Sequence, residues 1–220
     1  MQIAVIGASG RTGSQLVRVA RERGHDVVAV SRDATAHRLE AFADDAGVRT
    51  ETASVVSDEA MLTRAMTGCD AVLVILISAR DLKATDLVRS LARAGEATNV
   101  KRFVFTAGEI TVVPEMGETF TTRQKLVKML AGAIMPFTPY SLSDMIEASR
   151  LVRAREDWSW TIVRAPTLVD GPPTGYRLGK LSEVTGAHKL PRADYAACLL
   201  DVIEDEATRD RMLTVLPAGA

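Results

Sequence analysis

The sequence predicts an α/β protein in which helices cover both faces of a doubly wound, mostly parallel sheet. Two observations carry this prediction. Short apolar, β-branched runs alternate with longer amphipathic stretches, which is the pattern of repeated strand–helix units. The run at 70–77 is almost unbroken apolar sequence, as expected for a central strand that is covered on both faces. Because crossover connections are right-handed, this alternation favours an open sheet of the Rossmann type.

The individual elements follow from this alternation and from the residues that begin and end helices. The expected strands are the β-branched runs at 3–6, 26–31, 48–54, 70–77, 101–106, 160–164 and 212–216. The expected helices lie at 15–23, 36–45, 58–68, 81–95, 121–132, 143–155 and 194–204, and residues 111–120 are expected to be a loop. The expected N-caps of three of these helices are Asp58, Ser143 and Asp194.

Length and composition indicate one globular domain. The 220 residues are expected to form a cofactor half at about 1–110, followed by a substrate-side half at about 111–220 that includes a small C-terminal lobe. Hydrophobic residues at 47% and charged residues at 25% exclude a disordered chain. We expect a monomer or homodimer.

The charge and the rarer residues exclude several functional classes. Twenty-seven basic against 28 acidic residues give a net charge of −1, which lacks the basic footprint of a nucleic-acid-binding protein. Two cysteines offer no disulfide framework, and three scattered histidines offer no metal site. The first residues resemble neither a signal peptide nor a membrane span, so we expect a cytoplasmic protein without membrane contact.

A glycine-rich segment directly follows the first expected strand and opens the first expected helix. It reads Gly-Ala-Ser-Gly-Arg-Thr-Gly over residues 7–13. In a dinucleotide-binding loop, Gly7 permits the tight turn, Gly10 lets a diphosphate approach the backbone, and Gly13 lets helix and strand pack closely. The free amides at the helix N-terminus then bind the phosphates. A plain structural turn is the alternative, and the strand–helix context favours nucleotide binding.

The end of the second strand indicates which nicotinamide cofactor fits. An acidic residue about twenty positions after the glycines binds the ribose 2′-hydroxyl of NAD. Here Arg32, preceded by Ser31, lies nineteen positions after Gly13. A guanidinium suits a 2′-phosphate, and Arg11 is a second candidate for that group. NADP(H) is therefore the expected cofactor, with a solvated arginine as the alternative.

Five segments together resemble the atypical short-chain dehydrogenase/reductase group. They are GASGRTG, VAVSRD, VKRFVFTAGE, WTIVRAPTLVDGPPTGYRL and LPRADYAACLLDVI. NmrA-like NAD(P)H-binding proteins and the biliverdin reductase B or flavin reductase type are the most similar members. At the adenine position, where this family often has Asp, the chain has Ser54. The resemblance implies NADP contacts at Gly7, Ser9, Gly10, Arg11, Thr12 and Arg32, adenine contacts at Ser54 and Val55, and a nicotinamide side formed by Ser78, Thr106, Pro166 and Thr167.

The proton relay of ordinary short-chain dehydrogenases is missing from the sequence. That relay uses Tyr-x-x-x-Lys on a helix, because the lysine charge lowers the pKa of the phenol. Four residues after Tyr140 stands Asp144, whose charge has the opposite effect. Tyr176 does precede Lys180 by four residues, but this pair follows the sixth expected strand (160–164) and a Pro-Pro turn. No catalytic residue is assigned.

Two functions fit these residues. In the first, the protein is an NADPH-dependent reductase that positions a hydride for a flat acceptor such as a flavin or quinone, which takes its proton from solvent. In the second, it binds NADP(H) as a sensor or regulator without turnover, as the NmrA-like resemblance implies. A lyase or epimerase is disfavoured by the missing relay. Asp144 is expected either to contact substrate or to be a solvated loop charge, and Trp158 and Trp160 are expected in the core.

Overall fold

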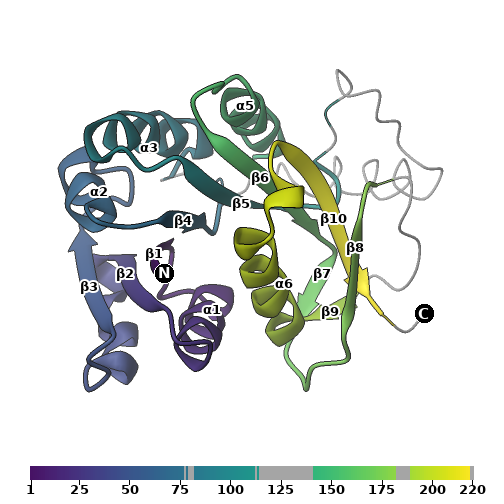
Figure 1. Ribbon diagram of the computed structural model, residues 1–220, viewed down its shortest axis with the longest axis horizontal. Coiled ribbons are helices and arrows are strands. Elements are labelled where there is room, and N and C mark those ends of the chain that lie inside the picture. Colours follow the sequence, from purple (N-terminus) through teal and green to yellow (C-terminus); the bar gives the residue numbers. More distant parts are fainter. Residues whose placement is uncertain (77, 79–81, 112, 114–140, 182–188, 219–220) are drawn as a thin grey trace.

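The computed structural model describes residues 1–76, 78, 82–111, 113, 141–181 and 189–218. Helices lie on both faces of a central sheet, giving three layers (Figure 1). The loop expected at 111–120 (apart from Thr111 and Val113) and the helix expected at 121–132 lie outside the described residues. No helix in the described ranges is long and apolar enough to cross a bilayer.

The central sheet has eight strands in the order β3-β2-β1-β4-β5-β6-β10-β8. Neighbouring strands are parallel, except that β8 is antiparallel to β10. The strands are β1 (Gln2–Ile6), β2 (Asp26–Arg32), β3 (Val48–Ala53), β4 (Ala71–Val74), β5 (Arg102–Gly108), β6 (Ser159–Ala165), β8 (Tyr176–Gly179) and β10 (Arg211–Pro217). The order confirms the doubly wound prediction, and the switch point between β1 and β4 is where such sheets bind ligands.

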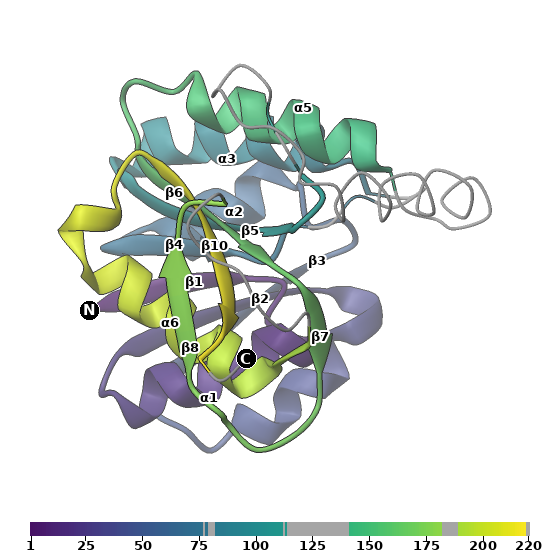
Figure 2. The same cartoon turned by 90° about the vertical axis from the view of Figure 1, so that its right-hand side faces the viewer.

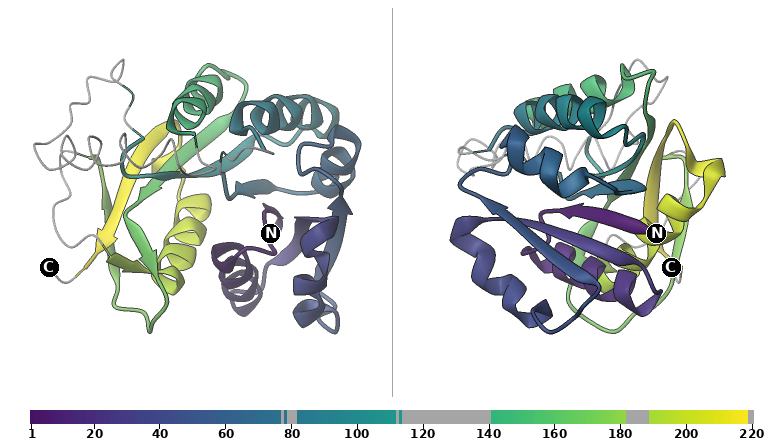
Figure 3. Two further views of the ribbon diagram at one scale, coloured as in Figure 1. Left: turned by 180° about the vertical axis from the view of Figure 1, so that it is seen from behind. Right: turned by 60° about the vertical axis from the view of Figure 1, so that its left-hand side comes forward.

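The helices divide between the two faces of the sheet (Figures 1 and 2). One face is covered by α2 (Glu59–Met66), α3 (Ala84–Thr98) and α5 (Leu142–Arg153), and the other by α1 (Arg11–Glu22) and α6 (Arg192–Glu204). The same layers are visible from behind (Figure 3). A separate two-stranded parallel sheet contains β7 (Thr167–Val169) and β9 (Lys189–Pro191).

Each face of the sheet has its own apolar core. Alternate residues of β6 point to opposite faces, so Ile162 joins the core under α3 while Val163 joins the core under α1 and α6. Trp158 and Trp160 are both buried in the first core, as predicted, and the Trp158 ring stacks on Phe103 with centroids 4.0 Å apart. These cores hold the carboxyl ends of the strands in a fixed relation.

The strand expected at 70–77 ends earlier, at Val74. The Leu76 amide donates to the Val74 carbonyl and to the Thr106 hydroxyl, each at 2.9 Å, instead of continuing the ladder. The chain therefore turns away from the sheet at this point, although its sequence remains apolar. Apolar character alone predicted burial correctly and strand length wrongly.

Helix starts were predicted with mixed success. Asp58 is the N-cap of α2, where its carboxylate accepts from the Met61 amide at 2.7 Å. The predicted cap Ser143 is wrong, because the N-cap of α5 is Ser141, which accepts from the Asp144 amide at 3.3 Å. Ser141 and Ser143 each precede an acidic residue by about one helical turn, so the pattern located the start of the helix within two residues.

Two further expectations about helices are corrected. Asp194 is not the cap of the late helix: α6 begins at Arg192, and Asp194 lies buried in its first turn. The helix expected at 36–45 is a 3-10 helix, η1 (Asp33–Phe42). Its buried residues Leu39 and Phe42 are three apart, and three residues per turn place them on the same side of a 3-10 helix.

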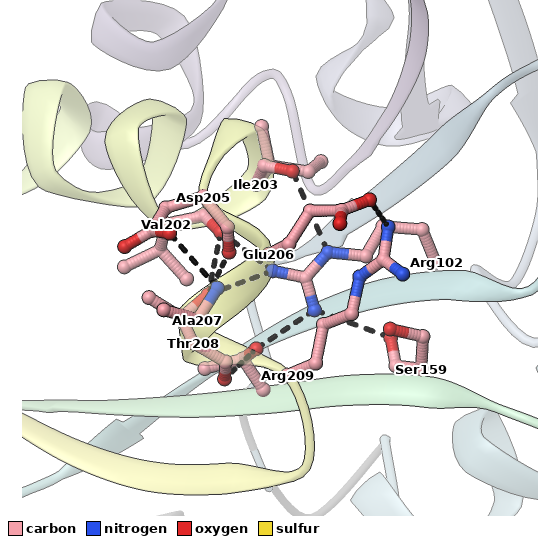
Figure 4. Close-up of polar contacts among 10 residues, drawn as sticks. Arg102, Ser159, Val202, Ile203, Asp205, Glu206, Ala207, Thr208 and Arg209 are labelled. Atoms are coloured by element: carbon pink, nitrogen blue, oxygen red, sulfur yellow. Dashed lines mark hydrogen bonds and ion pairs between the residues drawn. The ribbon is translucent and has the colours of Figure 1, made fainter.

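The C-terminus of α6 is held by Arg102, a buried residue of β5 (Figure 4). Its guanidinium donates to the carbonyls of Val202 at 2.5 Å and Ile203 at 3.5 Å, in the last turn of α6. It also donates to the hydroxyls of Thr161 and Thr208. Burial lowers the pKa of Arg102 to about 10. The cation thus stabilises the helix end at which carbonyls lack partners.

Candidate cofactor site

The glycine loop joins β1 to α1 through a tight turn. Gly7 has φ +91°, a conformation that glycine adopts without strain. The amides of Gly7 and Ala8 both donate to the Val30 carbonyl of β2 at 3.0 Å. A Cβ on Gly13 would lie 2.2 Å from the Gly7 carbonyl oxygen, so only glycine fits there. Gly7 and Gly13 therefore have the conformations and close packing that a dinucleotide-binding loop requires.

The N-terminus of α1 is open to an anion. Its N-cap, Gly10, has no side chain, and the first turn contains no acidic residue. By contrast, α2 has both an aspartate N-cap and a glutamate in its first turn. A Cβ on Gly10 would contact only the Gly7 carbonyl oxygen, at 3.3 Å, so the other side of this position is unobstructed. Uncapped amides and the positive helix end favour a phosphate group here.

Hydrogen bonds between side chains and backbone fix the end of β2 beside the glycine loop. The Ser9 and Thr35 hydroxyls are 2.8 Å apart, and the Thr35 hydroxyl donates to the Arg32 carbonyl at 3.2 Å. Ser31 is buried, and its hydroxyl donates to the same carbonyl at 3.3 Å. Arg32 itself is half-buried. Three of the predicted cofactor residues, Ser9, Ser31 and Arg32, thus lie together.

Arg11 has an ion-pair partner that the sequence did not predict. The sequence makes it a second candidate for the 2′-phosphate, and in this structure its guanidinium lies 3.8 Å from the Asp170 carboxylate, which follows β7. Asp170 is also paired with Arg192 at 2.6 Å. Thr12, the next residue of α1, is buried in the helix–sheet interface. The Arg11 guanidinium therefore lies beside the segment that follows β7.

The residues expected beside the adenine follow β3. Ser54 and Val55 are both exposed. Val55 is 48% exposed, and it and Met1 are the exposed large hydrophobic residues in the described part of the chain. An exposed valine after β3, at the same carboxyl edge of the sheet as the glycine loop, offers an apolar surface to an adenine ring.

The residues expected on the nicotinamide side are mostly buried. Thr106 is 6% exposed, and its hydroxyl accepts from the Leu76 amide at 2.9 Å. Ser78 is 2% exposed. Pro166 is buried after β6, whereas Thr167 is exposed on β7. The structure thus brings the ends of β4, β5 and β6 together and uses the Thr106 hydroxyl to hold one of them.

Tyr195 of α6 was not among the predicted site residues, yet it lies against the end of β6. It is fully buried, and its hydroxyl donates to the Val163 carbonyl at 2.8 Å. Burial raises the pKa of Tyr195 well above 10, and a hydrogen bond from the Thr106 side chain offsets only part of this shift. The available signal was a tyrosine within an apolar helix, because a buried phenol needs a polar partner.

Asp144 is not a solvated loop charge, because it lies in the first turn of α5 and its carboxylate is hydrogen-bonded to a second helix. Its carboxylate accepts from the Ala84 amide at 2.6 Å and from the Thr85 hydroxyl at 2.7 Å. It therefore caps α3 from the first turn of α5, and the cap position of α3 itself provides no side-chain bond. The pairing is remote in sequence, so no local pattern predicted it.

Hydrogen bonding keeps Asp144 ionised. Burial works to raise the pKa of Asp144, but the Thr85 and Ser78 hydroxyls and the amides of Ala84 and Thr85 outweigh it and lower the pKa. The Ser78 hydroxyl contributes as a nearby dipole, because it makes no hydrogen bond of standard geometry. A negative charge thus stands four residues after Tyr140, which lies outside the described residues.

These features define a dinucleotide-binding protein, and comparison with known families agrees. The NAD(P)H-binding family model matches residues 7–206, from the first glycine of the loop to just past the end of α6. The chain belongs to this NAD(P)H-binding family. The uncharacterized protein YwnB of Bacillus subtilis (strain 168) is 24% identical over 98% of each chain. A probable pinoresinol-lariciresinol reductase 3 of Arabidopsis thaliana is 30% identical over 62% of this chain and 45% of its own.

Solved structures share the fold. A short-chain dehydrogenase/reductase from Veillonella parvula, crystallised with NADP, superposes with a TM-score of 0.79 at 18% identity, over 99% of this chain and 95% of its own. The anaerobilin reductase ChuY of Escherichia coli O157:H7 superposes with a TM-score of 0.76 at 16% identity, over 100% and 98%. The predicted Rossmann fold is thereby confirmed, and the family model confirms the predicted NAD(P)H-binding class.

Proposed function

We propose that this protein is an NADPH-dependent reductase that delivers a hydride to a planar acceptor such as a flavin or a quinone. When bound, the cofactor supplies two electrons and one hydrogen as hydride, and the acceptor takes one further proton from solvent. The uncapped N-terminus of α1 beside Arg32 is the observation that carries the cofactor part of this proposal. The protein's own contribution is to bind and orient the two reactants.

The preference for NADPH over NADH rests on the end of β2. A carboxylate at this strand end would accept from the 2′-hydroxyl of NAD, whereas Arg32 is a donor that pairs with a 2′-phosphate. The contacts of Ser31 and Thr35 with its carbonyl hold the backbone of Arg32 in place. The backbone of Arg32 is therefore already ordered before the cofactor binds, which limits the entropic cost.

The choice of a flavin or quinone as acceptor rests on the hydrogen bonds of Tyr176, Tyr195 and Asp144. Tyr176 lies on β8 and donates to Asp201, and a strand does not bring Lys180 to the same place as a helical turn would. Tyr195 is buried with a raised pKa, and Asp144 caps α3. Within the described residues no Tyr/Lys pair is available as proton donor. Flavins and quinones need none, because their reduced forms take a proton from water.

Arg32→Ala tests the cofactor. Charge-assisted hydrogen bonds contribute about 1.5–3 kcal/mol each, and Arg32 is half-buried, so we expect NADPH binding to weaken at least about tenfold. NADH binding should change by less than about twofold. The matched control is Arg89→Ala on α3, which removes an exposed arginine paired with Asp86. Equal loss of NADPH and NADH affinity in titration calorimetry would contradict the assignment.

Steady-state assays test the reaction. NADPH oxidation is measured at 340 nm with FMN, FAD and a series of quinones, and wild-type protein should turn over at least one of them. Its rate should exceed that of Arg32→Ala at sub-saturating NADPH. Tight NADPH binding with no turnover in the whole series would instead favour the sensor or regulator that the NmrA-like resemblance implies.

A further inference from the structure

The segment after β7 is held at both ends by the first turn of α6. At one end the Arg192 guanidinium donates to the Leu168 carbonyl at 3.0 Å and to the Asp170 carboxylate at 2.6 Å. At the other end the buried Asp194 carboxylate accepts from the Thr174 amide at 2.7 Å and from the Gly175 amide at 3.1 Å. Residues 170–175 are therefore anchored to a packed helix.

Asp170 faces two arginines that differ in how firmly they are held. The Arg192 side chain is 11% exposed and has the second bond to Leu168. The Arg11 side chain is 75% exposed, lies 3.8 Å from the carboxylate, and belongs to the open first turn of α1. An exposed, long ion pair of this kind contributes little to stability. Asp170 thus keeps one strong partner if Arg11 leaves.

From this geometry we propose that Asp170 is a positioning residue that competes with the cofactor diphosphate for Arg11. The inference rests on the proposed function, because it takes the N-terminus of α1 as the diphosphate site. When the diphosphate binds, the Arg11 guanidinium exchanges a carboxylate for phosphate oxygens, with which it forms two parallel hydrogen bonds. Asp170 then remains paired with Arg192, so its charge is not left alone.

The diphosphate, not the 2′-phosphate, is the group that Arg11 meets. The 2′-phosphate site is at the end of β2, and β2 lies on one side of β1 in the sheet order. β6, whose continuation leads to Asp170, lies on the other side of β1. The Arg11 guanidinium pairs with Asp170, on the β6 side of the site. The effect of Asp170 is therefore equal for NADPH and NADH, in contrast to that of Arg32.

The sign of the effect follows from charge. Asp170 both neutralises Arg11 and places a negative charge near an anion site, so its removal strengthens anion binding. We expect Asp170→Asn to bind NADPH and NADH about two- to fivefold more tightly, the range of a surface ion pair. Inorganic pyrophosphate, which has only the shared diphosphate, should show the same gain. All three gains should shrink at high ionic strength.

A double-mutant cycle tests the competition in the full-length protein. Dissociation constants for NADPH, NADH and pyrophosphate are measured for wild type, Asp170→Asn, Arg11→Ala and the double variant. In the Arg11→Ala background, Asp170→Asn should change each constant by less than about 1.5-fold. The control Glu206→Gln removes a charge that is 79% exposed and paired with Arg209. Glu206 precedes β10, which begins at the amino ends of the parallel strands, whereas the glycine loop lies at their carboxyl ends. The control should leave all three constants unchanged.

Each outcome decides between the two proposals. If Asp170→Asn binds all three ligands with wild-type affinity, or gains equally with and without Arg11, the competition is refuted while the proposed function stands. A gain for NADPH alone also refutes it, because that result places Arg11 at the 2′-phosphate. If wild-type protein binds neither NADPH nor NADH, the proposed function and the competition fail together.

Discussion

Alanine at Gly13 and at Gly10 should separate the packing of the glycine loop from its binding role. A Cβ on Gly13 would overlap the Gly7 carbonyl oxygen at 2.2 Å and the Ala8 Cα at 2.8 Å, and both are backbone atoms that no rotamer change can move. Helix α1 must therefore shift away from β1, which loosens its buried face. Such overpacking costs about 3 kcal/mol, and at roughly 2–4 °C per kcal/mol the Tm falls by about 6–12 °C.

Gly10→Ala is the matched variant, because its methyl group meets only one atom, at 3.3 Å, and φ −77° suits alanine. Its Tm should lie close to the wild-type value, since a poorer N-cap and a less flexible unfolded chain nearly cancel, leaving about 1 kcal/mol or less. The methyl group stands where the diphosphate approaches, however. Losing one or two charge-assisted bonds should weaken NADPH binding about ten- to a hundredfold.

Differential scanning fluorimetry with and without NADPH measures both quantities on the same samples. Gly13→Ala should melt early even without cofactor, and Gly10→Ala should melt normally but lose the stabilisation that NADPH gives. Wild-type NADPH affinity in Gly10→Ala would refute the close approach of the diphosphate to this backbone. A wild-type Tm in Gly13→Ala would refute the tight contact between α1 and β1.

Two further variants test the contacts that hold the helices. Arg102→Met should lower the free energy of unfolding by about 3 kcal/mol, because it removes the buried donor that joins the end of α6 to Thr161 and Thr208. Urea unfolding measures this, and a loss below about 1 kcal/mol would contradict the role of Arg102. Asp144 has a pKa below its ordinary value of 3.8, so its stabilising effect is present above that value and is lost as the pH falls through the lowered one. Urea unfolding between about pH 2 and 7 should thus show that Asp144→Asn loses less stability in acid than wild type does. Among the described residues, Asp45 and Asp157 also have lowered pKa values, and they are present in both proteins. Parallel curves of unfolding free energy against pH would contradict the cap.

The sequence was most informative where structure is local. The glycine spacing and the strand–helix alternation predicted the loop, the sheet class and the positions of Ser31 and Arg32 at the end of β2, because each depends on neighbours in the chain. Strand β4 was predicted too long, since the Leu76 amide bonds a hydroxyl that is thirty residues away. The Asp144–Ala84 and Asp170–Arg11 contacts also join distant segments. No local pattern contains such pairings, so they could not be predicted from the sequence of this chain alone.

Three polar groups at the carboxyl edge of the sheet make structural hydrogen bonds, and this limits their use as proton donors. The Thr106 hydroxyl accepts a hydrogen bond from the Leu76 amide, and the Tyr195 hydroxyl donates one to the Val163 carbonyl. Asp144 caps α3. Each of these three groups thus joins two elements through hydrogen bonds. Converting any of them to a proton donor during turnover would break a buried bond, at a cost of about 1–3 kcal/mol. Acceptors that obtain their proton from water avoid this cost, and for them a rigid edge that orients the cofactor is sufficient.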